Sequence, residues 1–574
     1  MTRILAICAL FLFYMHANMA CAQVIQKENL TKQQTTYWDF NKVKVRATGK
    51  YYKDILGETT DEHGRWLYYD REGVVEEERN YYRGMLYGSV TRFFPNGKKE
   101  QEGFFKWDAQ DSTYTEWYET GGIKVRGEYS LGTAVGRWEY YYRDGKLKSV
   151  EEIIDSINYV WEFYLPDSLH TQTIKDGNGE LTTYYTTGGV KEWYNFNNGL
   201  KDGAFEELSV YGYVTLQGAF LKGKKDGEWK YYYYTGDLEK VSNYKEDVLQ
   251  GKYAYYYDNG QVNVEGQYDN GEKVGEWTWY TNTGSRDMKG TFKASQQHGD
   301  WTYWFPTGEL SYNAKFDMGK RSGTWSYFYR NGKKYKEGPF ADDRKNGAWK
   351  TWYEDETLLM EGDYVNGVEE GEWRNYWENG ELKNVAEFKN GRLDGNWESY
   401  FPNGKQHLLG KYKDDMKVGE WIESFDNGKP KDLMTYKLVK KKSPVDYGPA
   451  KDHVVMESRL SGPSVSYSAK DFKKTEEGSY KDGLKDGEWI AYHPGGRNPA
   501  VISSYKNGIL DGTMKQFDRR GDLLSEADYK NGVKHGRFLI YDKRGKIIAE
   551  KKFEYGMEVI EGRSNTPGSF TPGR

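Results

Sequence analysis

A glycine that recurs every 24 residues is the feature of this sequence that most constrains its fold. Every step from Gly179 to Gly419 is 24 residues, and in most of these copies a Trp or Tyr follows two residues later, as in Gly227-Glu-Trp229. The same 24-residue step links Gly64 to Gly88 and Gly512 to Gly536. Degenerate copies of the unit occur around Ser112, Gly136 and Pro463. A fixed period over roughly twenty units indicates a repeat protein in which each unit is one supersecondary element stacked on its neighbours.

Each unit carries the signal of a β-hairpin when its glycine is numbered position 0. Position 9 is usually Gly and often follows Asn, as at Asn96-Gly97, Asn259-Gly260, Asn331-Gly332, Asn379-Gly380, Asn403-Gly404 and Asn427-Gly428. Asn-Gly between alternating apolar residues favours a two-residue type I′ turn, because both residues tolerate a positive φ. Such a turn at positions 8 and 9 predicts that position 7 pairs with 10, 6 with 11, 4 with 13 and 2 with 15.

The residue types agree with this register. Position 15 is nearly always small, and a ring at position 2 of the same hairpin is expected to cover its bare backbone. Side chains alternate along a strand, so positions 2, 4, 6, 11, 13, 15 and the aromatic position 17 are expected on one face, with mainly polar residues on the other. A looser turn near positions 19–23 joins the hairpins. The sequence therefore predicts an all-β fold, an elongated antiparallel meander or solenoid of about twenty 24-residue β-hairpin repeats.

Composition supports this fold class and excludes others. Aromatic residues make up 17% of the chain, which excludes wholesale disorder. The mean hydropathy of -0.94 excludes a polytopic membrane protein. With a net charge of -5, the chain lacks the basic surface that is typical of a nucleic-acid-binding protein.

The first residues predict export. Arg3 precedes an apolar stretch from Ile4 to Tyr14, and Ala20-Cys21-Ala22 forms a small-residue cleavage site. We therefore expect a signal peptide over residues 1–22, cleaved near Ala22, and a periplasmic or secreted protein. Both cysteines, Cys8 and Cys21, lie in this segment, so the mature chain has no disulfide or thiolate metal site. A lipoprotein anchored at Cys21 is less favoured, because Asn18 replaces the aliphatic residue of a lipobox.

The unit over residues 251–274, GKYAYYYDNGQVNVEGQYDNGEKV, carries nearly all of these features. It resembles the MORN repeat family, specifically the bacterial MORN-variant proteins described as antitoxins. The resemblance extends from about Thr48 to Phe553. It implies an elongated β-hairpin array used for protein contacts, dimerisation or, in some members, membrane association. Antitoxin activity does not suit a secreted chain, which would not meet a cytoplasmic toxin.

Interruptions of the period set the expected domain organisation. We predict N-terminal MORN-like repeats with degenerate units over 34–178, a regular array over 179–436, C-terminal repeats over 462–561 and a disordered tail over 562–574. Residues 437–461, with Lys437, Lys440, Lys441, Lys442 and Pro444, are predicted to be a linker or excursion loop.

The sequence offers no catalytic, metal or cofactor constellation. His63, His298 and His535 each precede a unit glycine, where other copies have Asp or Asn, so we interpret them as turn residues. No Walker-type loop occurs, and no carboxylate pair stands out from the turns. We therefore expect a non-enzymatic protein without cofactors. An enzyme would have to place its site in the altered segments 151–178 or 437–461.

One feature exceeds what the repeat needs. Position 5 lies on the polar face yet is aromatic in eight successive units, at Tyr232, Tyr256, Tyr280, Trp304, Phe328, Trp352, Tyr376 and Tyr400. The row is either an inter-unit aromatic ladder that stiffens the sheet or a ligand-binding stripe that repeats about every 10 Å. Trp and Tyr suit the second use because they bury area at a low entropy cost.

Function follows as a hypothesis. We expect an extracytoplasmic protein-binding or scaffold surface, with a partner protein or a homodimer, because a single-layer sheet would leave the rings at positions 2, 6 and 17 partly wet. The alternative is a glycan or cell-envelope polymer binder that uses the position 5 stripe. Nucleic acid is not expected, and neither a basic charge nor an amphipathic helix supports membrane association.

Overall fold

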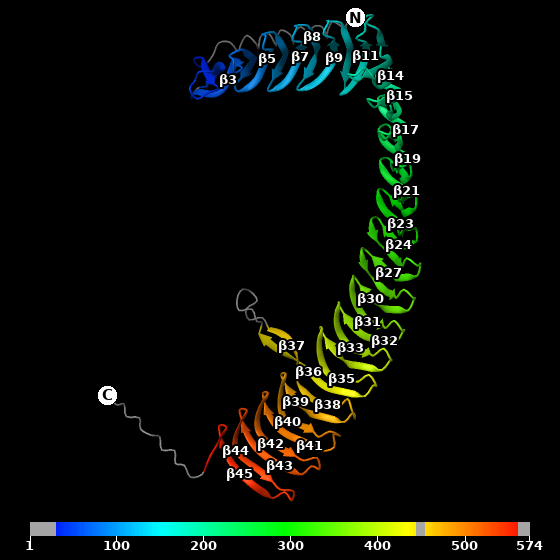
Figure 1. Cartoon of the computed structure of the whole chain (residues 1–574). Coiled ribbons are helices and arrows are strands. Elements are labelled where there is room, and N and C mark those ends of the chain that lie inside the picture. Colours follow the sequence, from blue (N-terminus) through cyan, green and yellow to red (C-terminus); the bar gives the residue numbers. More distant parts are fainter. Residues whose placement is uncertain (1–29, 55, 443–453, 561–574) are drawn as a thin grey trace, which may run out of the picture. The chain divides into compact units, whose positions relative to one another are not determined.

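Short strands and tight turns alternate along the whole computed structural model, which describes residues 30–54, 56–442 and 454–560 (Figure 1). The regular structure of these residues consists of strands. The predicted all-β hairpin repeat is therefore confirmed. The signal peptide over 1–22 and the tail over 562–574 lie outside the described residues.

The chain divides into two units, residues 1–273 and 274–574, each a row of antiparallel strands in which most strands pair with their neighbours in sequence. The strands of the first unit are β1 (Gln34–Tyr37), β2 (Val45–Asp54), β3 (Gly57–Tyr69), β4 (Val75–Tyr82), β5 (Met85–Phe93), β6 (Lys99–Lys106), β7 (Ala109–Trp117), β8 (Ile123–Ser130), β9 (Thr133–Tyr141), β10 (Leu147–Ile154), β11 (Ile157–Tyr164), β12 (Gln172–Lys175), β13 (Asn178–Tyr184), β14 (Val190–Asn197), β15 (Leu200–Leu208), β16 (Val214–Leu221), β17 (Lys224–Tyr232), β18 (Leu238–Lys245), β19 (Val248–Tyr256) and β20 (Val262–Asp269).

The second unit continues the same pattern, beginning with a strand that starts at Glu272. Its strands are β21 (Glu272–Tyr280), β22 (Arg286–Lys293), β23 (Gln296–Trp304), β24 (Leu310–Asp317), β25 (Lys320–Arg321), β26 (Gly323–Phe328), β27 (Lys334–Ala341), β28 (Arg344–Lys345), β29 (Gly347–Trp352), β30 (Leu358–Val365), β31 (Val368–Tyr376), β32 (Leu382–Lys389), β33 (Arg392–Tyr400), β34 (Gln406–Lys413), β35 (Met416–Ser424), β36 (Pro430–Lys442), β37 (Val454–Leu460), β38 (Gly462–Tyr467), β39 (Lys474–Lys481), β40 (Leu484–Tyr492), β41 (Pro499–Lys506), β42 (Ile509–Phe517), β43 (Leu523–Lys530), β44 (Val533–Tyr541), β45 (Ile547–Glu554) and β46 (Met557–Glu558).

The hairpin register confirms part of the prediction and corrects the rest. In β31–β32, Trp373 pairs with Ala386 (positions 2 and 15), and position 4 pairs with 13 as predicted. Position 6 does not pair with 11. Tyr376 at position 5 pairs with Leu382 at position 11, and the register shifts between positions 4 and 5. Position 11 therefore shares the face of position 5, opposite to that of position 2.

The turn type explains the shift. The N–H of Gly380 donates to Trp377 O at 2.9 Å, and the N–H of Trp377 donates to Glu381 O at 2.8 Å, so the loop has three residues. Gly380 has φ +85°, whereas Asn379 keeps a negative φ. This is a type I turn closed by a glycine bulge, and the predicted type I′ turn is wrong here. The Asn379 side chain instead caps the turn, accepting the N–H of Glu381 at 3.1 Å.

The tight two-residue turn occurs at the other end of the unit. Asn390 and Gly391, at positions 19 and 20, have φ +50° and +75°, and they join Lys389 to its pairing partner Arg392. This is the type I′ geometry that we expected at positions 8 and 9. The N–H of Gly391 also donates to Glu369 O of the preceding hairpin at 2.9 Å, which ties successive turns together.

The repeated glycine at position 0 makes a bulge between hairpins. Gly227 has φ +74°, and β16 and β17 shift register there, with Gln217 opposite Lys230 but Ala219 opposite Asp226. L-residues with side chains rarely adopt such a φ. Near Pro463 the residue in this conformation is Gly462, at φ +133°, so Pro463 is position 1 of its unit.

The bulge carries the position 2 ring over the preceding hairpin. Gly218 pairs with Phe205 in its own hairpin, yet a Cβ on Gly218 would lie 2.3 Å from Cδ2 of Trp229 in the next hairpin. The indole N–H of Trp229 donates to Ala219 O at 3.1 Å. The same contact joins Gly49 to Trp66, Gly127 to Trp138, Gly290 to Trp301, Gly338 to Trp349, Gly362 to Trp373, Gly410 to Trp421 and Gly478 to Trp489. The predicted cover within one hairpin is therefore wrong, because the ring covers the glycine of the preceding unit.

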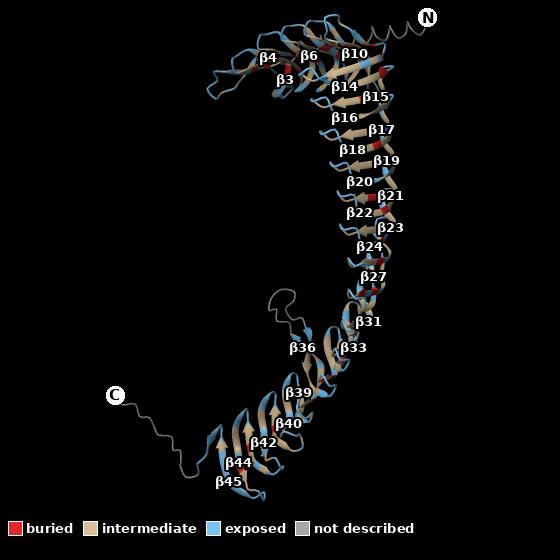
Figure 2. Ribbon diagram, turned by 45° about the vertical axis from the view of Figure 1, so that its right-hand side comes forward, coloured by how far each residue is buried: buried red, intermediate tan, exposed pale blue. Residues whose placement is uncertain are grey.

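These rings form the core. In the second unit Trp301, Phe316, Trp325, Phe340 and Trp349 alternate at centroid distances of 5.2–5.9 Å, mostly edge to face. Trp301 and Trp349 are each 2% exposed, and buried residues follow one side of the row of hairpins (Figure 2). One chain by itself therefore covers the rings at position 2, which we expected to be partly wet.

Within residues 437–461, predicted to be a linker or excursion loop, residues 437–442 and 454–460 form strands, and residues 443–453 lie outside the described part of the chain. β36 runs on to Lys442, and β37 pairs with it from Val454 to Leu460 before the array resumes at β38. The segment forms a two-stranded arm that leaves the row of hairpins (Figure 1).

Candidate functional site

The position 5 rings lie on the face opposite the tryptophan core. Each pairs with position 11, so rings face mainly Leu or Val, as in Trp304 with Leu310 and Trp352 with Leu358. The predicted register, with 6 opposite 11 and 4 opposite 13, also places position 12 opposite position 5. This pairing is wrong, because the register shift leaves position 12 as an unpaired bulge residue. All eight predicted rings are half-buried: Tyr232 and Tyr256 in the first unit, and Tyr280, Trp304, Phe328, Trp352, Tyr376 and Tyr400 in the second. We call this row the outer stripe.

The outer stripe is not an aromatic ladder. Among the described residues, no ring contact joins Trp304, Phe328, Trp352, Tyr376 and Tyr400 to one another, whereas the inner rings form a chain of such contacts. Each ring instead pairs with position 11 of its own hairpin, which is Leu or Val in five of the eight units. The ladder that stiffens the sheet is therefore the inner row at positions 2 and 17.

Charged residues flank the outer stripe. The hydroxyl of Tyr376 donates to Glu361 at 3.0 Å, and Lys350 lies 3.1 Å from the same carboxylate. Partial burial alone would raise the pKa of Glu361, but the bonds from Lys350 and Tyr376 outweigh it and hold that pKa below its ordinary value. Burial and the Glu361 contact raise the pKa of Tyr376, so its hydroxyl stays protonated as a donor. The stripe thus combines half-exposed rings with oriented polar groups.

Lysines at position 22 cover the inner ladder, a feature that we did not infer from the sequence. The Nζ of Lys345 lies 4.6 Å from the ring centre of Trp349 and 4.4 Å from that of Tyr364. Burial and the neighbouring Lys336 lower the pKa of Lys345 to about 8. Equivalent lysines lie over the next unit's ring at Lys225, Lys417, Lys485 and Lys534. The recurrence of Lys two residues before the unit glycine could have predicted these lysines from the sequence.

The three histidines lie in strands β3, β23 and β44, directly before the position 0 glycine, so their interpretation as turn residues is wrong. His63 is 4% exposed, and its Nδ1 accepts the N–H of Arg83 at position 19 over 3.2 Å. His535 accepts the N–H of Tyr555 in the same way, and Asn346 and Asp511 accept the equivalent N–H in other units. His298 lies 3.3 Å from the carboxylate of Asp317. The described residues contain no group of His, Cys, Asp and Glu that could hold a metal ion.

His63 should make the first hairpins sensitive to acid. Burial, followed by the charge of Arg83, lowers the pKa of His63, which is also flanked by the rings of Tyr52 and Tyr82. The unfolded state therefore binds the proton first, so this stability is complete above about pH 6.5 and falls as the pH drops through the folded pKa, by at most about 1.4 kcal/mol per pH unit. We expect His63→Asn to keep the accepted bond, as Asn346 does, and to remove the pH dependence. Hydrogen exchange of residues 57–82, corrected for intrinsic rates, measures it; an unchanged pH profile in the variant would contradict the prediction.

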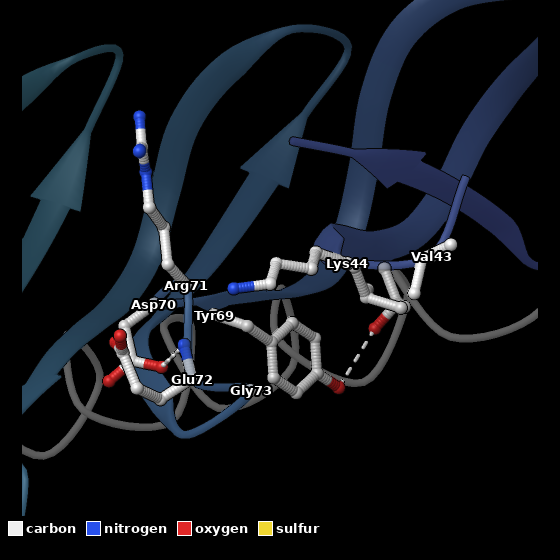
Figure 3. Close-up of a pocket in the computed structure, with 9 residues that line it drawn as sticks. Val43, Lys44, Tyr69, Asp70, Arg71, Glu72 and Gly73 are labelled. Carbon is white, nitrogen blue, oxygen red and sulfur yellow. Dashed lines mark hydrogen bonds between the residues drawn. The ribbon is translucent and has the colours of Figure 1, made fainter. Parts of the chain in front are cut away.

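A cavity of about 610 Å³ lies at the start of the first unit, between residues 43–48 and the turn at residues 69–73 (Figure 3). Its wall includes Tyr69, the position 5 ring of that hairpin, whose hydroxyl lies 3.3 Å from Oγ1 of Thr48. The Asp70 carboxylate accepts the N–H groups of Glu72 and Val74, so it acts as a turn cap. The cavity therefore extends the outer stripe and offers no acid–base pair.

Together these features define an open array of β-hairpins with a buried aromatic ladder on one face and a half-exposed stripe on the other. The family model for the MORN repeat variant matches residues 62–81, 86–106, 134–154, 225–246, 249–270, 321–342, 345–366, 369–390, 393–414, 417–438 and 510–531. The chain therefore belongs to the MORN repeat family, as the resemblance indicated. No curated protein matches the chain. In the described residues, no helix is long and apolar enough to cross a membrane.

Solved structures give only distant similarities. The crystal structure of TcdB2-TccC3 is 12% identical over 91% of this chain and 31% of that chain, with a TM-score of 0.13. That of TcdB2-TccC3-Cdc42 is 12% identical over 91% and 30%, with a TM-score of 0.12. The chain spans less than a third of their length. With so little superposition, we infer nothing about this chain from them.

Proposed function

We propose that the chain is a non-enzymatic, extracytoplasmic scaffold that binds a partner protein along its outer stripe. The observation that carries the proposal is the contrast between the two faces. Inner rings such as Trp301 are covered within the chain, whereas outer rings such as Trp304, which pairs with Leu310, are only half-buried and stack on no other ring of the stripe between Trp304 and Tyr400. Rings of this kind bury contact area at a low entropy cost. We expected a homodimer because it would cover wet inner rings. Rings such as Trp301 are covered within one chain, so the proposed function does not need a homodimer.

Replacing two rings of the outer stripe should abolish partner binding without unfolding the array. We expect Trp304→Ala/Trp352→Ala to lose at least tenfold in retention of a protein partner purified from the native envelope. The matched control is Tyr211→Ala/Tyr234→Ala, because these rings are more exposed, at 84% and 85%, but lie at turns rather than in the stripe. Quantitative affinity capture with each variant measures the effect. Equal retention by both variants would contradict the proposal.

Purified cell-wall polymer distinguishes the glycan alternative. If the wild-type chain is retained on the polymer and the stripe variant is not, while no protein partner is captured, the stripe binds sugar rings.

A further inference from the structure

The arm of β36 and β37 replaces a two-residue turn. In a regular unit Lys389 is followed by Asn390-Gly391 and then by Arg392-Leu393. In the unit with the arm Lys437 and Arg459-Leu460 take the equivalent places, and residues 438–458 stand between them. The arm is therefore an insertion at the turn edge, and the hairpins on either side keep their register.

The base of the arm reproduces the contact that the turn would make. In regular units the second turn residue donates its N–H to the preceding hairpin, as Gly391 does to Glu369 O. In the arm the Ser458 hydroxyl donates to Lys417 O, the equivalent carbonyl, at 2.6 Å. The arm is thus anchored in a defined position and not merely tolerated as a loop.

The distal half of the arm has open strand edges. Among the described residues, β36 beyond Tyr436 pairs with β37 alone, and β37 pairs with β36 alone. Lys440 pairs with Met456 and Lys441 with Val455. Val454, Val455 and Met456 are 56%, 44% and 42% exposed. A two-stranded ribbon is marginally stable in water, and its open edges are templates for a further strand.

The part of the arm in β36 is strongly basic although the chain has a net charge of -5. Residues 437–442 and 454–460 contain four lysines and Arg459 against a single acid, Glu457. Glu457 pairs with Lys441 at 3.4 Å and with Arg459 at 3.0 Å. Lys437 and Lys440 are exposed, and no described acidic side chain lies within ion-pair distance of them. The arm therefore has spare positive charge along β36.

We propose that the arm binds an acidic, extended segment of a partner protein as a third strand along the open edge of β36, an inference that rests on the proposed scaffold function. Main-chain hydrogen bonds to the edge supply affinity. Lys440 and Lys441 point to opposite faces of the ribbon, so acidic residues at successive positions of the added strand meet a lysine on each face. Lysines along an edge also disfavour uncharged strands, which makes the edge selective.

Restoring the regular turn tests the proposal in the full chain. The variant replaces residues 438–458 with Asn-Gly, the turn that Lys389 and Arg392 flank in the native array. The probe is a fluorescein-labelled peptide in which pairs of successive Glu alternate with pairs of Val, and fluorescence anisotropy measures its binding. We expect the wild-type chain to bind it and the turn variant to bind at least tenfold more weakly with unchanged thermal unfolding. Equal binding by the turn variant would overturn the proposal.

Charge reversal of lysines on β36 distinguishes binding at its edge from non-specific electrostatic attraction to the chain. We expect Lys437→Glu/Lys440→Glu to weaken peptide binding at least tenfold, and the matched pair Lys389→Glu/Lys405→Glu, exposed lysines of regular units, to leave it within twofold. Peptide addition should protect the amides of Leu438 and Lys440 from hydrogen exchange, because the N–H groups of Val439 and Lys441 face β37. Equal binding of a Lys-Val peptide, or arm-dependent binding to anionic phosphatidylserine vesicles without peptide binding, contradicts the proposal. The stripe variant Trp304→Ala/Trp352→Ala should still bind the peptide, so failure of the stripe and failure of the arm are distinguishable.

Discussion

Gly338→Ala is expected to destabilise the second unit by about 3 kcal/mol, although it adds one methyl group. The new Cβ would lie 2.2 Å from Cδ2 of Trp349, whose ring is 2% exposed and whose indole N–H is held by Pro339 O at 3.0 Å. The ring must shift and repack its 5.2 Å edge contact with Phe340. Trp325 shows the relaxed arrangement next to Ala314, because its indole N–H still donates to Lys315 O at 3.2 Å. Denaturant unfolding, with hydrogen exchange over residues 334–352, measures the loss.

The chain itself supplies the control and the rescue. Where the next unit has Ser464 in place of the tryptophan, position 15 is the large Met434, and in the last unit it is Lys551. We therefore expect Lys551→Ala to change stability by less than about 0.5 kcal/mol. We also expect Gly338→Ala to cost much less in a Trp349→Ser background, because the clash disappears. Additive effects of the two substitutions would show that Trp349 does not cover Gly338.

Trp301→Ala is expected to cost about 4 kcal/mol, the range for truncating a buried tryptophan. Trp301 is 2% exposed, contacts Phe292 and Phe316 at 5.2 and 5.9 Å, and donates to Thr291 O at 3.2 Å. Its removal leaves a cavity between two hairpins of the ladder. Chemical denaturation followed by far-ultraviolet circular dichroism measures the change without relying on the lost fluorophore.

Trp304, three residues along the same strand, is the matched control. It lies in the half-exposed outer stripe and pairs with Leu310. We expect Trp304→Ala to cost at most about 1.5 kcal/mol, because the indole leaves solvent-exposed surface rather than a closed cavity. If the two substitutions destabilise the chain equally, then the two faces of the sheet do not differ as the structure indicates.

Several features followed from local patterns in the sequence. The 24-residue period predicted the hairpin array, and the pairing of positions 2 with 15 and 4 with 13 is confirmed. The histidines before the unit glycine share their place with Asp or Asn, but they lie in strands, and His63 and His535 accept an N–H from a neighbouring turn, so the inference that they are turn residues was wrong. The outer stripe could also be predicted from the repeat, because the aromatic residues at position 5 recur at the 24-residue period.

The turn types could not be derived in the same way. Asn-Gly occurs at both ends of the unit, at Asn379-Gly380 and at Asn390-Gly391, yet one is a three-residue loop and the other a type I′ turn. Both geometries accept the dipeptide, so local preference does not choose between them. The choice depends on the register that buries the position 2 ring, which is a property of the packed array.

The sequence by itself determined the fold class, the repeat length and the strand content, because these follow from backbone preferences that act within one unit. Only the tertiary structure decided which hairpin each tryptophan covers, that lysines shield the inner ladder, and that residues 437–460 carry an arm. Those features arise from contacts between units, where the bulge at position 0 moves a side chain across the boundary. The spacing of residues along the sequence does not show that the position 2 ring is displaced onto the preceding hairpin.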